Sequence, residues 1–171
     1  MIGTSALRKE DGPLLTGAAR FVGDVARPGM VHAVVLRSSV AHARILSLDA
    51  REALAQPGVV AVVTAADLPP DTPAIPMRMF TRPGMERFLQ PPLAVDTVRY
   101  SGEPVAVVIA GSRYEAEDAA ELVEVGYEPL EPVLAADAAL AEDAPMLHAS
   151  AGTNLAGEFV VEAGDVEAAF A

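Results

Sequence analysis

Short apolar runs separated by turn residues are the clearest pattern in this chain. Residues 30–37, 59–64 and 103–110 are rich in valine, isoleucine and alanine, and each run predicts a β-strand. Both faces of the run 30–37 are largely apolar, so we expect this strand to lie at the centre of its sheet. His32, which falls within it, is then expected to be a hydrogen-bonded core histidine.

Two short helices are predicted from capping signals between these runs. Asp49 is followed three residues later by Glu52, and Pro57-Gly58 ends the segment, which favours a helix capped by Asp49. Ser112 and Glu115 repeat the same spacing before a second helix.

One face of this second helix is predicted to be buried, because small apolar residues recur there at helical spacing. These residues are Ala116, Ala119, Ala120 and Val123. A strand over 123–127, ended by Pro129, follows at once. The resulting strand–helix–strand order predicts an α+β (mixed α/β) domain with a mixed sheet and short capped helices.

Three regions are predicted along the chain. Residues 1–29 are polar and rich in turns, which is typical of an extended arm. Residues 30–150 hold the strands and helices, including a long Pro/Met-rich loop at 69–92 and a further short helix at 135–140. Residues 151–171 form an extended connection in which Asp165 caps a last helix, and we expect that helix to continue in a longer protein.

Composition narrows the possible functions. The chain has 171 residues, no cysteine and a formal net charge of −12, with Lys9 as its single lysine. Thiolate metal sites and iron–sulfur clusters are excluded from it, and nucleic acid is an improbable partner for so acidic a chain. No apolar run reaches the roughly 18 residues of a membrane span, and no signal peptide is evident, so a cytoplasmic location without membrane contact is expected.

No catalytic, cofactor-binding or metal-binding residue is predicted. The three histidines, His32, His42 and His148, show no metal-ligand spacing, and no nucleophile elbow, phosphate loop or dinucleotide fingerprint occurs. The carboxylates of residues 115–121 belong to the exposed side of a helix, which favours a solvated face over an acid–base pair. An unrelated small enzyme, such as a hydrolase, would need a constellation that this sequence does not offer.

Several strings nevertheless resemble, in order and spacing, the large subunits of the xanthine dehydrogenase, aldehyde oxidase and carbon monoxide dehydrogenase family. The matching blocks cover most of residues 3–157. They are RKED (8–11), LLTG (14–17), PGMVHA (28–33), LRS (36–38), AHARI (41–45), PGVVAVVT (57–64), YSGEPVAVV (100–108), RYEAEDAAELV (113–123) and YEPL (127–130). The chain departs from the family pattern at a few positions, among them Gly126, where an aspartate is common before Tyr127.

This resemblance implies an α/β-hammerhead fold within a much longer subunit. In that family a molybdenum-pterin dinucleotide hydroxylates CO, aldehydes or N-heterocycles with oxygen from water, and electrons leave through iron–sulfur and FAD subunits. The motifs that hold the cofactor belong to later domains, so no catalytic residue is carried over. We therefore expect a non-catalytic fragment that packs on the remaining molybdopterin-binding domains and that, alone, exposes apolar surface and can form a homodimer.

An alternative from the same resemblance is a free-standing interaction or assembly module derived from this family. A reading frame that continues far beyond Ala171 would favour the fragment, whereas one that stops there would favour the module.

Overall fold

The computed structural model describes the chain except for residues 1–2, 4, 6–7, 77–83, 162 and 171, together with the side chain of Val166. It divides into two compact units, Met1–Val31 and His32–Ala171. The domain boundaries expected from the sequence, after residues 29 and 150, stay predictions.

The first unit contains two short helical turns, α1 (Asp11–Leu15) and η1 (Val22–Asp24). The Asp24 carboxylate accepts a hydrogen bond from the Phe21 amide at 2.9 Å, which closes the second turn. The described residues of α1 are all at least partly exposed, and Leu15 is 87% exposed. The expected extended arm is therefore interrupted by these turns, which hold few apolar contacts.

The second unit begins with a three-stranded antiparallel sheet in the order β1 (His32–Arg37), β5 (Pro104–Ala110) and β3 (Val59–Thr64). β5 is the central strand, and its Val105, Ala106 and Val108 are almost completely buried. The prediction of a central strand at 30–37 is wrong, because β1 lies at the edge and every second residue in it is exposed. Two of its outward side chains, Ala33 and Val35, are apolar, which is why the sequence pattern predicted a strand buried on both faces.

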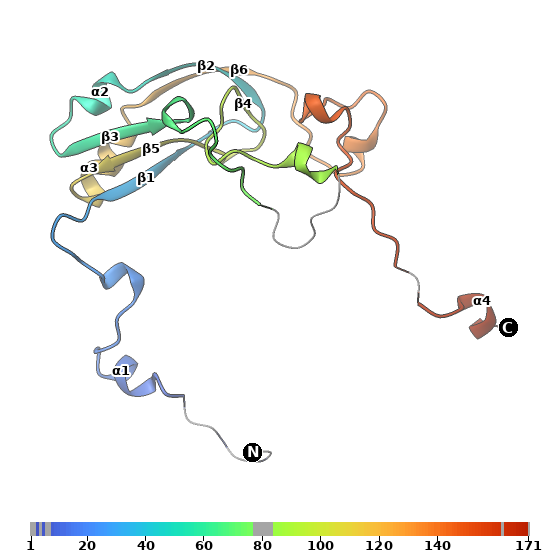
Figure 1. Cartoon of the computed structure of the whole chain (residues 1–171), viewed down its shortest axis with the longest axis horizontal. Helices are drawn as coiled ribbons and strands as arrows, with labels where there is room; N and C mark the ends of the chain where they lie inside the picture. The colour runs from blue at the N-terminus through green and yellow to red at the C-terminus, as the bar shows by residue number, and fades with distance from the viewer. Residues whose placement is uncertain (1–2, 4, 6–7, 77–83, 162, 171) are drawn as a thin grey trace. The chain divides into compact units, whose positions relative to one another are not determined.

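A second antiparallel sheet has the order β4 (Thr97–Val98), β2 (Ala43–Asp49) and β6 (Glu124–Pro129), and β2 and β6 run side by side in Figure 1. β2 and β4 were not expected from the sequence. A bulge between Ile45 and Ser47 breaks the regular alternation of β2, so its strand pattern is hidden.

The prediction of a mixed sheet is wrong, because every strand pair between the named strands is antiparallel. The predicted strand–helix–strand segment does exist as β5, α3 (Arg113–Ala120) and β6. However, β6 does not join the sheet of β5. It pairs with β2 in the second sheet, so this segment forms no parallel strand pair. The α+β class itself is confirmed.

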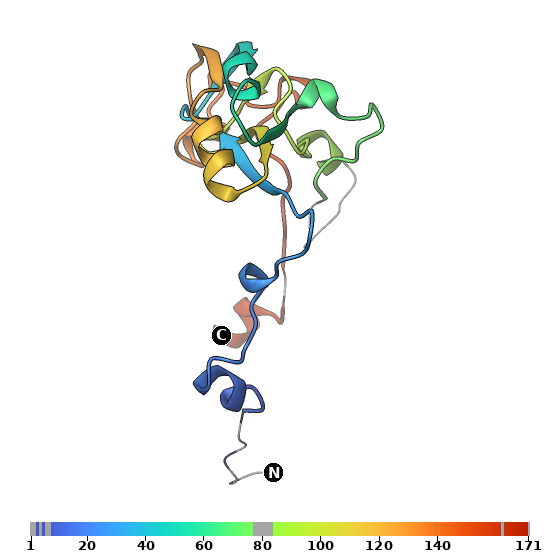
Figure 2. The same cartoon turned by 90° about the vertical axis from the view of Figure 1, so that its left-hand side faces the viewer.

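α3 packs against β1 and β5, as Figures 1 and 2 both show. The predicted cap is confirmed, because the Ser112 hydroxyl accepts a hydrogen bond from the Glu115 amide at 3.2 Å. The predicted buried face is confirmed as well, since Ala116 and Ala119 are fully buried. Alanine at these positions lets the helix backbone approach the sheet closely.

α2 (Arg51–Leu54) begins one residue later than expected. Ala50 occupies the cap position and its methyl group accepts no hydrogen bond, so the prediction of Asp49 as the cap is wrong. Its carboxylate instead accepts a hydrogen bond from the Arg51 amide at 3.0 Å. The helix buries Ala53 completely.

Two clusters of buried residues form the core of this unit. One joins Ala53, Val108, Ala119, Ala120 and Val123, and the other joins Ala43, Ala94, Val98 and Val105. Leu48 and Val125 pack against both clusters, so the two sheets share a continuous core. Its members are mostly alanine and valine, as the low aromatic content implies.

Single turns occupy much of the rest: η2 (Ala65–Asp67), η3 (Met85–Phe88), η4 (Ala138–Leu140) and η5 (Ala149–Ala151). The described part of the predicted Pro/Met-rich loop at 69–92 contains η3 and an isolated bridge between Ile75 and Gln90, whereas Met77 and Met79 lie outside the described residues. The helix predicted at 135–140 is reduced to η4. The last helix, α4 (Val166–Phe170), has its predicted cap, because Asp165 accepts a hydrogen bond from the Ala168 amide at 3.0 Å.

Candidate functional site

The three histidines lie in different parts of the second unit. His42 is buried, and its Nδ1 atom lies 2.7 Å from the Glu131 carbonyl oxygen. His32 sits half-buried on edge strand β1, so the prediction of a core histidine is wrong for His32 and describes His42 instead. The burial of His42 was not predicted, because the strand β2 that begins beside it was not expected. Within the described ranges, no group of three histidine or carboxylate residues is placed to hold a metal ion.

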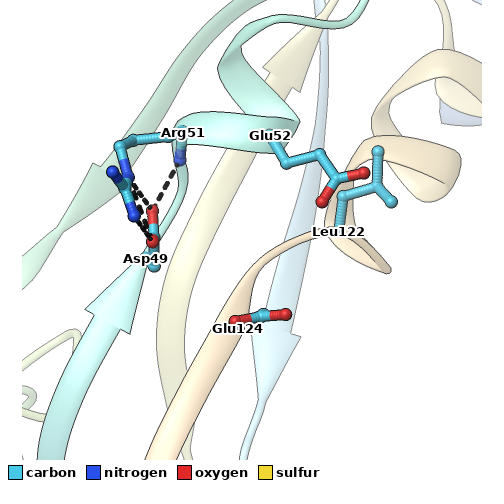
Figure 3. A pocket seen from close by; sticks show the side chains of 5 residues that line it. All are labelled: Asp49, Arg51, Glu52, Leu122 and Glu124. Atoms are coloured by element: carbon cyan, nitrogen blue, oxygen red, sulfur yellow. Dashed lines mark hydrogen bonds and ion pairs between the residues drawn. The ribbon is translucent and has the colours of Figure 1, made fainter.

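An acidic hollow of about 360 Å³ lies where β2 meets α2 (Figure 3). It is lined by Asp49, Arg51, Glu52, Leu122 and Glu124. The Arg51 guanidinium forms an ion pair with Asp49 at 2.5 Å, and this hydrogen bonding lowers the pKa of Asp49 to about 2. Because Arg51 is already paired, Glu52 and Glu124 leave the hollow negatively charged and unsuited to an anionic ligand.

An apolar hollow of about 260 Å³ opens between the two sheets. Its lining includes Ile45 and Leu48 of β2, Val105 of β5, and Ala94 and Val95 of the connecting loop. Val95 is 67% exposed, so the apolar character of this region reaches the surface. A hollow of this kind offers contact area without groups for chemistry.

A third hollow lies at the free edge of β1. This shallow hollow of about 410 Å³ is lined by His32, Val34 and Arg37 and by Arg113 and Glu117 of α3. Arg113 and Glu117 form an ion pair at 2.8 Å one helical turn apart, which raises the pKa of Arg113. The two charges compensate each other, while Arg37 donates to the Gly102 carbonyl at 2.9 Å, so the hollow combines the strand edge with one positive charge.

A basic hollow of about 210 Å³ lies near η3 and η5. Arg87, Arg99 and His148 line it together with Gln90, Ser150 and a few neighbouring residues. The ring of His148 meets that of Phe88 edge to face, with centroids 5.4 Å apart. Neither arginine was singled out by the sequence, since each is isolated along the chain and only the fold brings them together.

The buried polar side chains of the second unit are hydrogen-bonded within the chain. Ser38 donates a hydrogen bond to the Val40 carbonyl at 2.8 Å, and the Glu103 carboxylate accepts one from the Arg99 amide. With His42, these are the buried polar side chains of the part of the chain that the structure describes, and none of their buried polar atoms lacks a partner there. The expectation that no residue of this chain binds a cofactor or performs catalysis stays a prediction.

One further observation concerns membranes. Across the described residues, no helix combines the length and the apolar character needed to cross a bilayer.

Comparison with known proteins gives consistent matches. The family described as aldehyde oxidase and xanthine dehydrogenase, a/b hammerhead domain, matches residues 16–131, which include both sheets. The 6-hydroxypseudooxynicotine dehydrogenase complex subunit gamma of Paenarthrobacter nicotinovorans is 47% identical over 140 residues, covering 78% of this chain and 17% of that protein. The carbon monoxide dehydrogenase large chain of Afipia carboxidovorans is 42% identical over 146 residues, covering 85% of this chain and 17% of that protein.

A solved structure agrees with these matches. Reconstituted CO dehydrogenase from Oligotropha carboxidovorans superposes with a TM-score of 0.74 at 42% identity, over 84% of this chain and 17% of that one. The chain therefore spans about one sixth of the length of these relatives. The hammerhead fold implied by the sequence resemblance is confirmed, and the chain belongs to the aldehyde oxidase and xanthine dehydrogenase a/b hammerhead domain family.

Proposed function

We propose that this chain acts as the non-catalytic hammerhead domain of a molybdenum hydroxylase large subunit that oxidises CO, aldehydes or N-heterocycles with water as the oxygen source. The observation that supports this most strongly is the unbroken match over residues 16–131, together with relatives of which the chain covers 17%. Such a share leaves most of a relative's chain to carry the cofactor and the reaction.

The role within the subunit is structural support. The core of small side chains gives a rigid body, and apolar side chains remain on its outside. Leu46 of β2 is 67% exposed, Val60 of β3 is 63% exposed, and Val95 borders the apolar hollow. We assign these side chains to contacts with the remaining molybdopterin-binding domains of the same subunit.

The cofactor and the other partners belong to the complete enzyme. A molybdenum-pterin dinucleotide is expected in the full-length subunit, and iron–sulfur and FAD subunits are expected beside it. The share of about 17% that this chain covers in its relatives supports placing the cofactor in the rest of the subunit. No step of the oxidation is therefore assigned to this chain, and a cytoplasmic location is part of the same proposal.

The experiment is metal analysis and activity measurement on the purified 171-residue chain, with the complete large subunit from Afipia carboxidovorans as the positive control. We expect no stoichiometric molybdenum in the chain and no dye reduction with CO, an aldehyde or a purine, whereas the control should contain molybdenum and reduce the dye with CO. Stoichiometric molybdenum in the chain, or turnover of any of the three substrates by it, would refute the proposal.

Light scattering supplies a second measurement. Apolar side chains that normally meet other domains should make the isolated chain dimerise or aggregate as its concentration rises. A monodisperse monomer at all concentrations would argue against an exposed apolar contact surface on this chain.

A further inference from the structure

Arg87 and Arg99 line one hollow, and neither forms an ion pair with another residue that the structure describes. The Arg99 guanidinium donates to the Leu147 carbonyl at 2.8 Å and to the Thr97 carbonyl at 3.1 Å. Arg87 donates to the Ala151 carbonyl at 3.1 Å and to the Gly84 carbonyl at 3.2 Å. These backbone oxygens hold the side chains in place without neutralising them.

No carboxylate neutralises either arginine among the residues that the structure describes. The ion pairs found there involve Arg8, Arg44, Arg51 and Arg113. Asp96 lines the same hollow, but it lies beyond ion-pair distance of both guanidinium groups. Among the described residues that line the hollow, two arginines therefore stand against one carboxylate, Asp96, in a chain whose net charge is −12.

The pKa of His148 is affected by the same positive charges. Partial burial and the charge of Arg99 lower its pKa below the ordinary value of 6.5. The groups around it are Arg87, Asp96, Arg99 and the uncharged Ser150. At neutral pH the imidazole is consequently uncharged and can still donate or accept one hydrogen bond.

We propose that this hollow binds a small oxyanion, a carboxylate or a phosphate, between Arg87 and Arg99. Guanidinium groups match the paired oxygens of both anions, and charge-assisted hydrogen bonds of this kind are the strong ones. The hollow of about 210 Å³ suits an anion of a few heavy atoms, and Gln90 and Ser150 add neutral hydrogen-bonding groups at its wall. This inference is independent of the proposed place of the chain in a larger enzyme.

The test is an NMR titration of the isotope-labelled full chain with inorganic phosphate and, separately, with succinate. Sodium chloride keeps the ionic strength constant, because screening alone alters exposed charges. We expect saturable shifts of the His148 ring signals and the Arg87 and Arg99 Nε signals with at least one of the two anions. Saturation with phosphate alone assigns a phosphate site, and saturation with succinate alone assigns a carboxylate site.

Variants locate the binding. Arg87→Gln should weaken it about tenfold, which is the effect of losing one charged hydrogen bond. Arg99→Lys keeps the charge but removes the planar fork, so it should weaken binding while the chain stays folded. Arg44→Gln is the matched control and should leave the affinity unchanged, because Arg44 is an exposed arginine that pairs with Glu128 on the sheet of β2 and β6 and does not line the hollow.

A bound anion should also raise the pKa of His148, because a negative charge nearby favours the imidazolium. A merely structural role for the arginines would leave that pKa unmoved by added anion. The proposal is overturned if chloride produces the same shifts, if neither anion saturates, or if Arg44→Gln weakens binding as much as Arg87→Gln does.

Discussion

Two parts of the second unit differ in how their side chains interact. The inner layer is the sheet of β1, β5 and β3 together with α3, and the outer sheet is the sheet of β4, β2 and β6. Where α3 meets β5, the contacts are made by fully buried small residues, among them Val108, Ala116 and Ala119. On the outer sheet, β2 exposes Leu46, and its Arg44 pairs with Glu128 of β6 at 3.3 Å while both side chains remain at least half exposed. Exposed ion pairs of this kind contribute little to stability, about 0–1 kcal/mol.

The two parts therefore contribute differently to the stability and the contacts of the domain. The inner layer stabilises the fold through close packing, which tolerates few changes. The outer sheet is less constrained by packing, so its exposed side chains can vary or serve contacts with other domains. Substitutions should consequently be costly in the inner layer and mild outside it.

The largest effect is expected from a charge in the inner layer. Val105→Asp places a carboxylate at a position that is 1% exposed. We expect a loss of about 4 kcal/mol or more in the free energy of unfolding, because an unpaired buried charge has no compensation. Urea denaturation followed by circular dichroism measures it.

Leu46→Asp is the control from the outer sheet, because Leu46 is a residue of β2 that is 67% exposed. It should cost about 1 kcal/mol or less, the range of strand propensity alone. Equal losses for the two variants would erase the distinction between the layers.

Gly58 gives the next effect, at the turn before β3. Its φ of +81° lies in the left-handed region, and a Cβ added there would collide with the carboxylate of Glu115. Gly58→Ala should therefore cost about 1–3 kcal/mol, chiefly through backbone strain. Combining it with Glu115→Ala separates the collision from the strain, since only the collision is then relieved.

Loss of the α3 cap should have a smaller effect. Ser112→Ala removes the acceptor of the Glu115 amide and should cost about 1 kcal/mol. Ser112→Asp, which restores an acceptor, should recover most of it in thermal unfolding. A Ser112→Ala variant as stable as the parent would mean that packing alone fixes the start of the helix.

The smallest effect is expected in the pH dependence of stability that comes from Asp49 on the outer sheet. The pKa of Asp49 is lowered from 3.8 to about 2 by Arg51, so the folded chain holds this carboxylate ionised more readily than the unfolded chain does. The resulting stabilisation is present above pH 3.8 and is lost as the pH falls towards 2.

Asp49→Asn should remove this part of the acid dependence. Because the pair is exposed, the difference should be the smallest of the series. Urea midpoints of parent and variant across the acid range measure it, and identical pH profiles would show that the Arg51 contact has no effect on folding.

The inner layer was largely predictable from sequence, because its signals are local. The β-branched run at β3, the cap at Ser112 and the alanine spacing of α3 each depend on residues a few positions apart. The pairing of strands that lie far apart in the sequence left weaker signals in the sequence pattern. The bulge at Ile45 and Ser47 concealed β2, and nothing near β6 indicates that it pairs with β2 rather than with the sheet of β5.

The basic hollow was unpredictable for the same reason. Arg87 and Arg99 lie far from His148 along the chain, and no local motif links them. By contrast, Gly126, which departs from the family pattern, is explained by its partner strand. A Cβ added there would lie 2.6 Å from the Ser47 hydroxyl oxygen, so the serine must rotate before a larger residue fits.

The most direct measurement exchanges this domain into a working relative. Residues 16–131 would replace the corresponding segment of the carbon monoxide dehydrogenase large chain of Afipia carboxidovorans, and molybdenum content and CO oxidation would be measured on the purified complex. A supporting body without chemistry of its own should yield a complex that retains molybdenum and measurable CO oxidation, whereas the same exchange carrying Val105→Asp should fail to assemble. A soluble, assembled complex that holds its molybdenum but has lost all CO oxidation would contradict the account, because the exchanged segment would then supply groups that the reaction needs.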